Sequence, residues 1–121
     1  MRFLLFSLLI ILAGIAYLSL APSEIVNDGN DKVGHLIAYA CLMVNFGLLT
    51  YFNRKKYTFA IVFALFYGGS MEIIQYFVPG RCMSIYDMLA NTAGVMFGVI
   101  IIYFFYNQMK AILKKLGVKL Q

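Results

Sequence analysis

FLLFSLLIILAGIAYLSL, residues 3–20, contains no charged side chain and decides the class of this protein. A helix needs roughly 20 residues to cross the hydrocarbon core of a bilayer, which is about 30 Å thick. This run is long enough, and it exceeds the apolar stretch of about 7–15 residues that is usual in a cleaved signal peptide. We therefore expect it to be retained as a membrane-spanning helix.

Three further apolar runs of similar length follow, at about residues 34–52, 58–78 and 87–106. Because 63% of the 121 residues are apolar and only 12% are charged, no soluble domain fits beside four such runs. After the fourth run, apolar residues recur at helical spacing among lysines, which predicts a short interfacial helix over residues 107–121. The sequence thus predicts an all-α membrane protein: one domain, residues 1–121, built as a four-transmembrane antiparallel helix bundle.

The basic residues are divided unevenly between the two sides that four crossings define. Only Lys32 and Arg81 fall on one side, and the others fall on the opposite side: Arg2, Arg54, Lys55, Lys56, Lys110, Lys114, Lys115 and Lys119. Lys and Arg accumulate on the cytoplasmic side, so both termini are expected to be cytoplasmic in a multi-pass protein of the cell inner, or plasma, membrane. Because the basic residues lie next to span ends, we expect membrane lipids, and not nucleic acid, as partners.

The acidic residues all fall outside the membrane or in its outer half: Glu24, Asp28, Asp31, Glu72 and Asp87. Acidic residues contribute little to orientation, so their placement is a separate indication that chemistry takes place at the outer face. Ionisable groups inside a membrane cost about 2.5–3.5 kcal/mol each on insertion scales. Those that persist usually face protein or water, which favours a polar site.

Polar residues of the second and third predicted helices lie at one level near the outer face. Asp31, His35 and Tyr39 are spaced by four and therefore share one helix face. Glu72 shares a face of the third helix with Gln75, which follows three residues later. The simplest structural alternative is that Glu72 pairs with Arg81 and holds the bundle together.

The fourth predicted helix carries a stripe that is polar at its outer end and small further in. Asp87 and Asn91 are followed on the same face by Gly94 and Gly98, a pattern that lets another helix approach closely. Ser84 is expected to cap this helix, with Asp87 completing an S-x-x-D capping box. The residues expected to form a ligand-binding site at this level are Asp31, Lys32, His35, Tyr39, Glu72, Gln75, Arg81, Ser84, Asp87 and Asn91.

At these positions the chain resembles the VanZ-like family of small bacterial membrane proteins. The resemblance rests on Asp31-Lys32-x-x-His35 with Tyr39, on Glu72-x-x-Gln75, and on Pro79-Gly-Arg81-x-x-Ser84-x-x-Asp87-x-x-x-Asn91-x-x-Gly94-x-x-x-Gly98. The family is named for an accessory factor in glycopeptide resistance, associated with teicoplanin, and no catalytic mechanism is established for it. The resemblance implies the fold, a place in the cell envelope and a shared outer-face site more firmly than an activity.

The first function hypothesis is a binding protein for a lipid-linked or lipidated amphiphile at the outer leaflet, which modulates envelope sensitivity to lipoglycopeptide antibiotics. Arg81, with Lys32, would hold an anionic head group, because arginine matches phosphate or carboxylate with two hydrogen bonds. The apolar helix faces would take an acyl chain. This hypothesis includes no catalytic activity, no cofactor and no metal.

The alternative is a membrane-embedded enzyme acting on a lipid, with His35 and Glu72 as the candidate catalytic acid–base pair. A variant of it has a metal ion held by Asp31, His35, Glu72 and Asp87. The sequence contains neither an HExxH nor a GxSxG motif, which places the enzyme second. A transporter ranks last, since the inner half of the membrane offers little polarity beyond Asn45.

Overall fold

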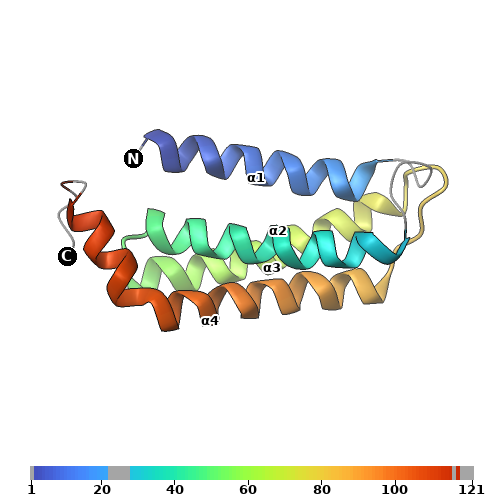
Figure 1. Ribbon diagram of the computed structural model, residues 1–121. Helices are drawn as coiled ribbons and strands as arrows, with labels where there is room; N and C mark the ends of the chain where they lie inside the picture. The colour runs from blue at the N-terminus through green and yellow to red at the C-terminus, as the bar shows by residue number, and fades with distance from the viewer. Residues whose placement is uncertain (1, 22–27, 116, 118–121) are drawn as a thin grey trace.

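The computed structural model describes residues 2–21, 28–115 and 117. These residues form four α-helices: α1 (Arg2–Leu20), α2 (Asp28–Leu49), α3 (Arg54–Gln75) and α4 (Ile85–Lys115). Each helix is long and apolar enough to cross a membrane. The helices alternate in direction, so α1 begins and α4 ends at the same end of the bundle (Figure 1). The predicted all-α, four-span fold is confirmed, while the cytoplasmic location of the two ends stays a prediction.

The turn between α2 and α3 is tighter than the apolar pattern indicates. α2 ends before the predicted residue 52, because Tyr51 and Phe52 adopt left-handed backbone conformations with φ of 51° and 59°. Asn53 then caps α3, and its side-chain oxygen accepts a hydrogen bond from the Lys56 backbone nitrogen at 3.2 Å. Asn is a preferred N-cap residue, so α3 begins at Arg54 and its first turn takes in the basic residues of the predicted loop.

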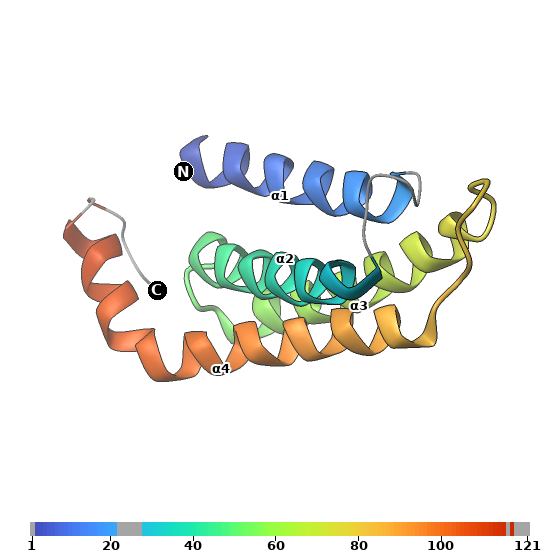
Figure 2. The ribbon, with the colours of Figure 1, turned by 45° about the vertical axis from the view of Figure 1, so that its right-hand side comes forward.

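α2 lies at the centre of the bundle. It packs closely along α4 and also contacts α1 and α3, whereas the described part of α1 makes no close backbone approach to α4 (Figures 1 and 2). Among the described residues, the central cluster of buried apolar side chains is small and contains Ile15, Tyr39, Leu42, Met43, Ala64 and Val95. Large apolar side chains such as Phe3, Phe66 and Tyr103 point outward instead. Helices that are apolar all round, over so thin a core, are typical of membrane spans.

Two hydrogen bonds attach α1 to its neighbours. Asn45 of α2 donates to the Ser7 hydroxyl at 2.6 Å, an interhelical hydrogen bond of the kind that polar side chains make inside membranes. Tyr67 of α3 donates its hydroxyl hydrogen to the Leu12 carbonyl at 3.0 Å. The first helix is therefore fixed to both α2 and α3 by polar contacts as well as by packing.

The predicted small-residue stripe of α4 packs directly on α2. A Cβ atom added at Gly98 would lie 2.6 Å from the Met43 Cβ and 2.7 Å from the Ala40 carbonyl oxygen. A Cβ atom at Gly94 would lie 2.9 Å from the Tyr39 Cβ. Only glycine permits backbones to approach this closely, so the prediction that the stripe faces another helix is confirmed.

α4 continues beyond the predicted end of its span at residue 106 and runs as one helix to Lys115. Its C-terminal part bends away from the bundle axis toward the side on which α1 lies (Figures 1 and 2). The part of the predicted interfacial tail at residues 107–115 is therefore an extension of α4, and its position at a membrane surface stays a prediction. Leu116, Lys119 and Leu120 of that tail, like Glu24, lie outside the described residues.

Candidate functional site

The candidate site lies at the end of the bundle where α1 and α3 end and α2 and α4 begin (Figure 1). The α3–α4 loop, residues 76–84, crosses the same end. Lys32 keeps 45% of its side chain exposed and Ser84 is half-buried, whereas the other predicted site residues are buried: Asp31, His35, Tyr39, Glu72, Gln75, Arg81, Asp87 and Asn91. Buried ionisable groups need partners inside the protein.

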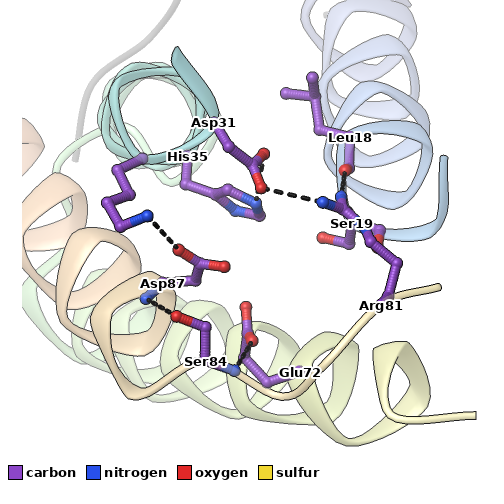
Figure 3. A network of polar contacts seen from close by, with 9 residues as sticks. Leu18, Ser19, Asp31, His35, Glu72, Arg81, Ser84 and Asp87 are labelled. Atoms are coloured by element: carbon purple, nitrogen blue, oxygen red, sulfur yellow. Dashed lines mark hydrogen bonds and ion pairs between the residues drawn. The ribbon is translucent and has the colours of Figure 1, made fainter. Parts of the chain in front are cut away.

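Arg81 ties the α3–α4 loop to two helices. Its Nη1 donates to the Asp31 Oδ2 at 3.1 Å, and its Nη2 donates to the backbone carbonyls of Leu18 at 2.6 Å and Ser19 at 3.5 Å (Figure 3). The last carbonyls of a helix have no partner within it, and a cation at that end is favoured by the helix dipole. The contribution of the first helix was missed in the sequence, because backbone carbonyls carry no residue signature.

Gln75 lies between Glu72 and Arg81. With its amide nitrogen toward Glu72, Gln75 donates to Oε2 at 2.9 Å and accepts from the Arg81 Nε at 3.1 Å, whereas the opposite orientation satisfies neither contact. Glu72 and Arg81 are thus linked through an amide. The alternative of a direct Glu72–Arg81 pair is wrong, since the carboxylate that pairs with Arg81 belongs to Asp31.

The N-terminus of α4 is capped by residues from two elements. The Ser84 hydroxyl accepts a hydrogen bond from the Asp87 backbone nitrogen at 3.3 Å, as the S-x-x-D pattern predicts. The reciprocal acceptor is Glu72 of α3, whose Oε2 accepts from the Ser84 backbone nitrogen at 3.4 Å. Glu72 takes the position of the reciprocal acceptor, and the Asp87 side chain instead lies near Lys32 of α2, with Oδ1 3.8 Å from Nζ.

We expect Glu72→Gln to leave the melting temperature of the purified protein unchanged or to raise it. The substitution removes a fully buried carboxylate, whose insertion into a membrane costs about 2.5–3.5 kcal/mol. The weakened hydrogen bond to Gln75 is the smaller contribution, at roughly 0.5–1.5 kcal/mol, and Arg81 keeps Asp31. Thermal unfolding in detergent micelles measures the net effect of losing the buried charge and weakening the hydrogen bond. A large fall in melting temperature would show that Glu72 holds the bundle together.

Asp31, His35 and Asp87 point toward one another (Figure 3). One potential ligand atom from each lies within 4.8 Å of the other two. His35 Nε2 lies 3.3 Å from Asp31 Oδ1, close enough for charge attraction but without hydrogen-bond geometry, so neither ring nitrogen has a hydrogen-bond partner. The carboxylate within ion-pair distance of the imidazole therefore belongs to Asp31, and the role of His35 and Glu72 as a catalytic acid–base pair stays a prediction.

Tyr39 and Asn91 form the inner end of the cluster. Both face the backbone at Gly68, where an added Cβ would lie 3.0 Å from the Tyr39 hydroxyl and 3.3 Å from the Asn91 Nδ2. Neither the hydroxyl nor the amide has a partner in hydrogen-bond geometry, although the Asn91 amide approaches Glu72. The cluster thus extends along α2 and α4 into the bundle without crossing it.

The charges of the cluster do not balance. Its three buried carboxylates, Asp31, Glu72 and Asp87, face two permanent cations, Arg81 and the half-exposed Lys32. One negative charge stays uncompensated whenever His35 is neutral. A buried net charge is costly, so the site is suited to take up a proton or a cation.

A polar cavity of about 370 Å³ opens beside the cluster. It is lined by Asp31, Lys32, Gln75, Gly80, Arg81, Cys82, Ser84 and Asp87. Cys82 and Cys41 are free and exposed. A separate apolar groove of about 440 Å³ lies between α1, α2 and α4, with Ser7 and Asn45 among its lining residues. The charged side chains thus line the polar cavity at one end of the bundle, and not the apolar groove.

The comparisons with known proteins identify a family. A family model described as VanZ/LLP1 matches residues 3–106, which include all four apolar runs and every predicted site residue. No curated protein and no solved structure gave a match. A match over most of the chain, together with four helices able to span a membrane, shows that this multi-pass membrane protein belongs to the VanZ/LLP1 family.

Proposed function

We propose that this protein binds the polar head of a lipid-linked or lipidated amphiphile at the outer leaflet of the plasma membrane, and thereby modulates envelope sensitivity to lipoglycopeptide antibiotics such as teicoplanin. The observation that carries the proposal is the polar cavity of about 370 Å³ at one end of an otherwise apolar bundle. Such a cavity combines convergent polar groups with access from the membrane surface, as small-molecule sites do. The family's association with teicoplanin supports the same class of ligand.

Lys32 and Asp87 are the residues that meet the head group in this proposal. Lys32 Nζ lies 3.8 Å from Asp87 Oδ1 at the cavity wall, and its side chain is 45% exposed. An anionic head group would take Lys32 as its partner, and an amine would take Asp87. Arg81 is a positioning residue instead, because its guanidinium already donates to Asp31 and to α1.

The acyl chain of the amphiphile would stay in the lipid against the outside of the bundle. Exposed apolar side chains surround the same end of the structure: Tyr76, Phe77, Met83, Ile85 and Tyr86. Aromatic and apolar side chains at this level suit the boundary between head groups and acyl chains. The amphiphile is thus held by its head in the cavity and by its chain in the bilayer.

Cys82 reports occupancy of the cavity, because it is exposed and lines the wall. In a Cys41→Ser background, we expect teicoplanin, which is acylated, to slow maleimide labelling of Cys82 in micelles more than unacylated vancomycin does. An extract of the cell's membrane lipids tests the lipid-linked source in parallel. Lys32→Ala and Asp87→Asn should abolish the protection, whereas Lys55→Ala, at the other end of the bundle, should retain it.

The same cysteine tests on which side of the membrane the cavity opens. A membrane-impermeant maleimide should label Cys82 in intact cells, because the positive-inside bias places the α3–α4 loop outside. Labelling that requires lysis would put the cavity on the cytoplasmic side. Labelling rates that neither teicoplanin nor the lipid extract changes would contradict amphiphile binding in the cavity.

A second candidate function is an enzyme that acts on the head group of a lipid. The observation in its favour is the approach of His35 Nε2 to Asp31 Oδ1 at 3.3 Å, which suits an imidazole oriented by a carboxylate for general-base work. Mass spectrometry of membrane lipids incubated with the purified protein would detect turnover. Turnover that is lost in His35→Asn would favour the enzyme over the binding protein.

A further inference from the structure

We propose that Asp31, His35 and Asp87 form a binding site for a divalent first-row transition-metal ion of the Zn²⁺ or Mn²⁺ type. Asp31 and Asp87 also line the cavity, but ion binding does not require an amphiphile, so the metal site is tested separately from the proposed function. Three ligand atoms lie close together, they lack hydrogen-bond partners, and the cluster around them carries an excess of negative charge.

The donors are arranged by two helices that pack closely. Asp31 and His35 are spaced by four on α2 and therefore lie one above the other. Asp87 comes from the first turn of α4, which packs along α2. The three ligand atoms lie within 4.8 Å of one another. Zn²⁺ holds nitrogen and oxygen ligands at about 2.0–2.2 Å, so donors on one ion are roughly 3–4 Å apart. Small side-chain rotations would close the difference.

The donor atoms are buried and lack hydrogen bonds. Asp31 and Asp87 are each 4% exposed and His35 is 1% exposed. Both ring nitrogens of His35, Oδ1 of Asp31 and Oδ1 of Asp87 have no hydrogen-bond partner. More than nine-tenths of buried polar atoms in proteins have such a partner. Unsatisfied ligand atoms from three side chains, one from each within 4.8 Å of the others, therefore suit the binding of a cation.

The second carboxylate oxygen of Asp31, Oδ2, is held by a hydrogen bond from Arg81. Arg81 donates to its Oδ2 at 3.1 Å, which leaves Oδ1 directed at the imidazole. Hydrogen bonds that orient a ligating carboxylate from outside the metal site are a regular feature of metal centres. The mixture of one imidazole and two carboxylates favours Zn²⁺ or Mn²⁺ over Ca²⁺ or Mg²⁺, which prefer oxygen ligands alone.

Lys32 would compete with a bound metal ion for Asp87. Its Nζ lies 3.8 Å from Oδ1 of Asp87, the same atom that would ligate the ion. Because the Lys32 side chain is 45% exposed, it can turn outward when a divalent ion enters. The ion would then supply the positive charge that the three buried carboxylates lack. The ion and the Lys32 ammonium group thus compete for the Asp87 carboxylate, so removing the Lys32 charge should favour metal binding.

The test uses the full chain, purified in mild detergent without an affinity tag, treated with chelator and studied by calorimetric titration with Zn²⁺, Mn²⁺ and Mg²⁺. Asp87→Asn and His35→Asn should each weaken Zn²⁺ or Mn²⁺ binding by at least about tenfold, while Lys32→Met should tighten it. Glu72→Gln removes a buried carboxylate that contributes to the charge of the cluster but lies outside the donor set, and should weaken binding less than Asp87→Asn or His35→Asn does. Melting temperatures without metal establish that each variant is folded.

Two further measurements test whether the metal ion binds at Asp31, His35 and Asp87. Binding must persist in the Cys41→Ser/Cys82→Ser protein, because exposed thiols bind Zn²⁺ on their own. Zn²⁺ or Mn²⁺ should raise the melting temperature of the wild type but not of folded Asp87→Asn. Absence of saturable binding, loss of binding with the cysteines, or equal weakening by Glu72→Gln and Asp87→Asn would each overturn the site. None of these outcomes involves an amphiphile, so they leave the cavity-binding proposal unaffected.

Discussion

Replacing Gly98 with leucine is expected to force α2 and α4 apart and to lower the free energy of unfolding by about 3 kcal/mol. A single added methyl group would already lie 2.6 Å from the Met43 Cβ and 2.7 Å from the Ala40 carbonyl oxygen. The carbonyl belongs to the backbone of α2, so it cannot rotate away as a flexible side chain would. Thermal or denaturant unfolding in micelles measures the loss.

Gly69→Leu is the matched control for this prediction. It inserts the same side chain into a membrane-spanning helix, at a glycine where an added Cβ meets no atom within 4 Å. Both variants change helix propensity alike, so their difference isolates the contact between α2 and α4. Equal melting temperatures for the two variants would show that the close approach at Gly98 contributes nothing to stability.

At Gly98 the sequence predicts a packed helix face but not the residues that pack against it. The spacing of Asp87, Asn91, Gly94 and Gly98 predicts that these residues share a face and that the face is packed, because helical periodicity determines both. It does not predict that Ala40 and Met43 receive the stripe. Which helix lies beside which depends on lateral packing, and no local pattern encodes that order.

The same distinction applies to the polar cluster. The depth of each residue along its helix follows from the rise per residue, and the predicted residues are indeed gathered at one end of the bundle. Which of these residues contact one another does not follow from the rise per residue. Glu72 and Arg81 are close in sequence and opposite in charge, yet Gln75 separates them and Arg81 reaches Asp31 instead.

The capping of α4 explains why the charges are arranged in this way. An S-x-x-D pattern predicts that Asp87 turns back to its own helix, but Glu72 of α3 accepts the Ser84 backbone hydrogen. Asp87 is thereby left to face His35 and Asp31. The predicted set of four metal donors is thus reduced to three, because the fourth, Glu72, is used in the cap.

Arg81→Met is the second change with a large expected effect, a loss of about 3–5 kcal/mol in the free energy of unfolding. Methionine retains much of the apolar stem but removes the donors to Asp31, to Leu18 and to Ser19. The Asp31 carboxylate is then buried without its cation, and the end of α1 loses its attachment to the loop. Arg54→Met, at an exposed arginine of α3, is the control and should change stability by less than about 0.5 kcal/mol.

The double variant Arg81→Met/Asp31→Asn separates the two parts of that loss. If an uncompensated carboxylate dominates, neutralising Asp31 should restore most of the melting temperature, because breaking one half of a buried pair costs far more than removing both halves. If the carbonyls of Leu18 and Ser19 dominate, the double variant should stay as unstable as Arg81→Met, because those acceptors still lack a donor. Arg81→Met melting like Arg54→Met would contradict both explanations and show that the guanidinium does not hold α1, α2 and the α3–α4 loop together.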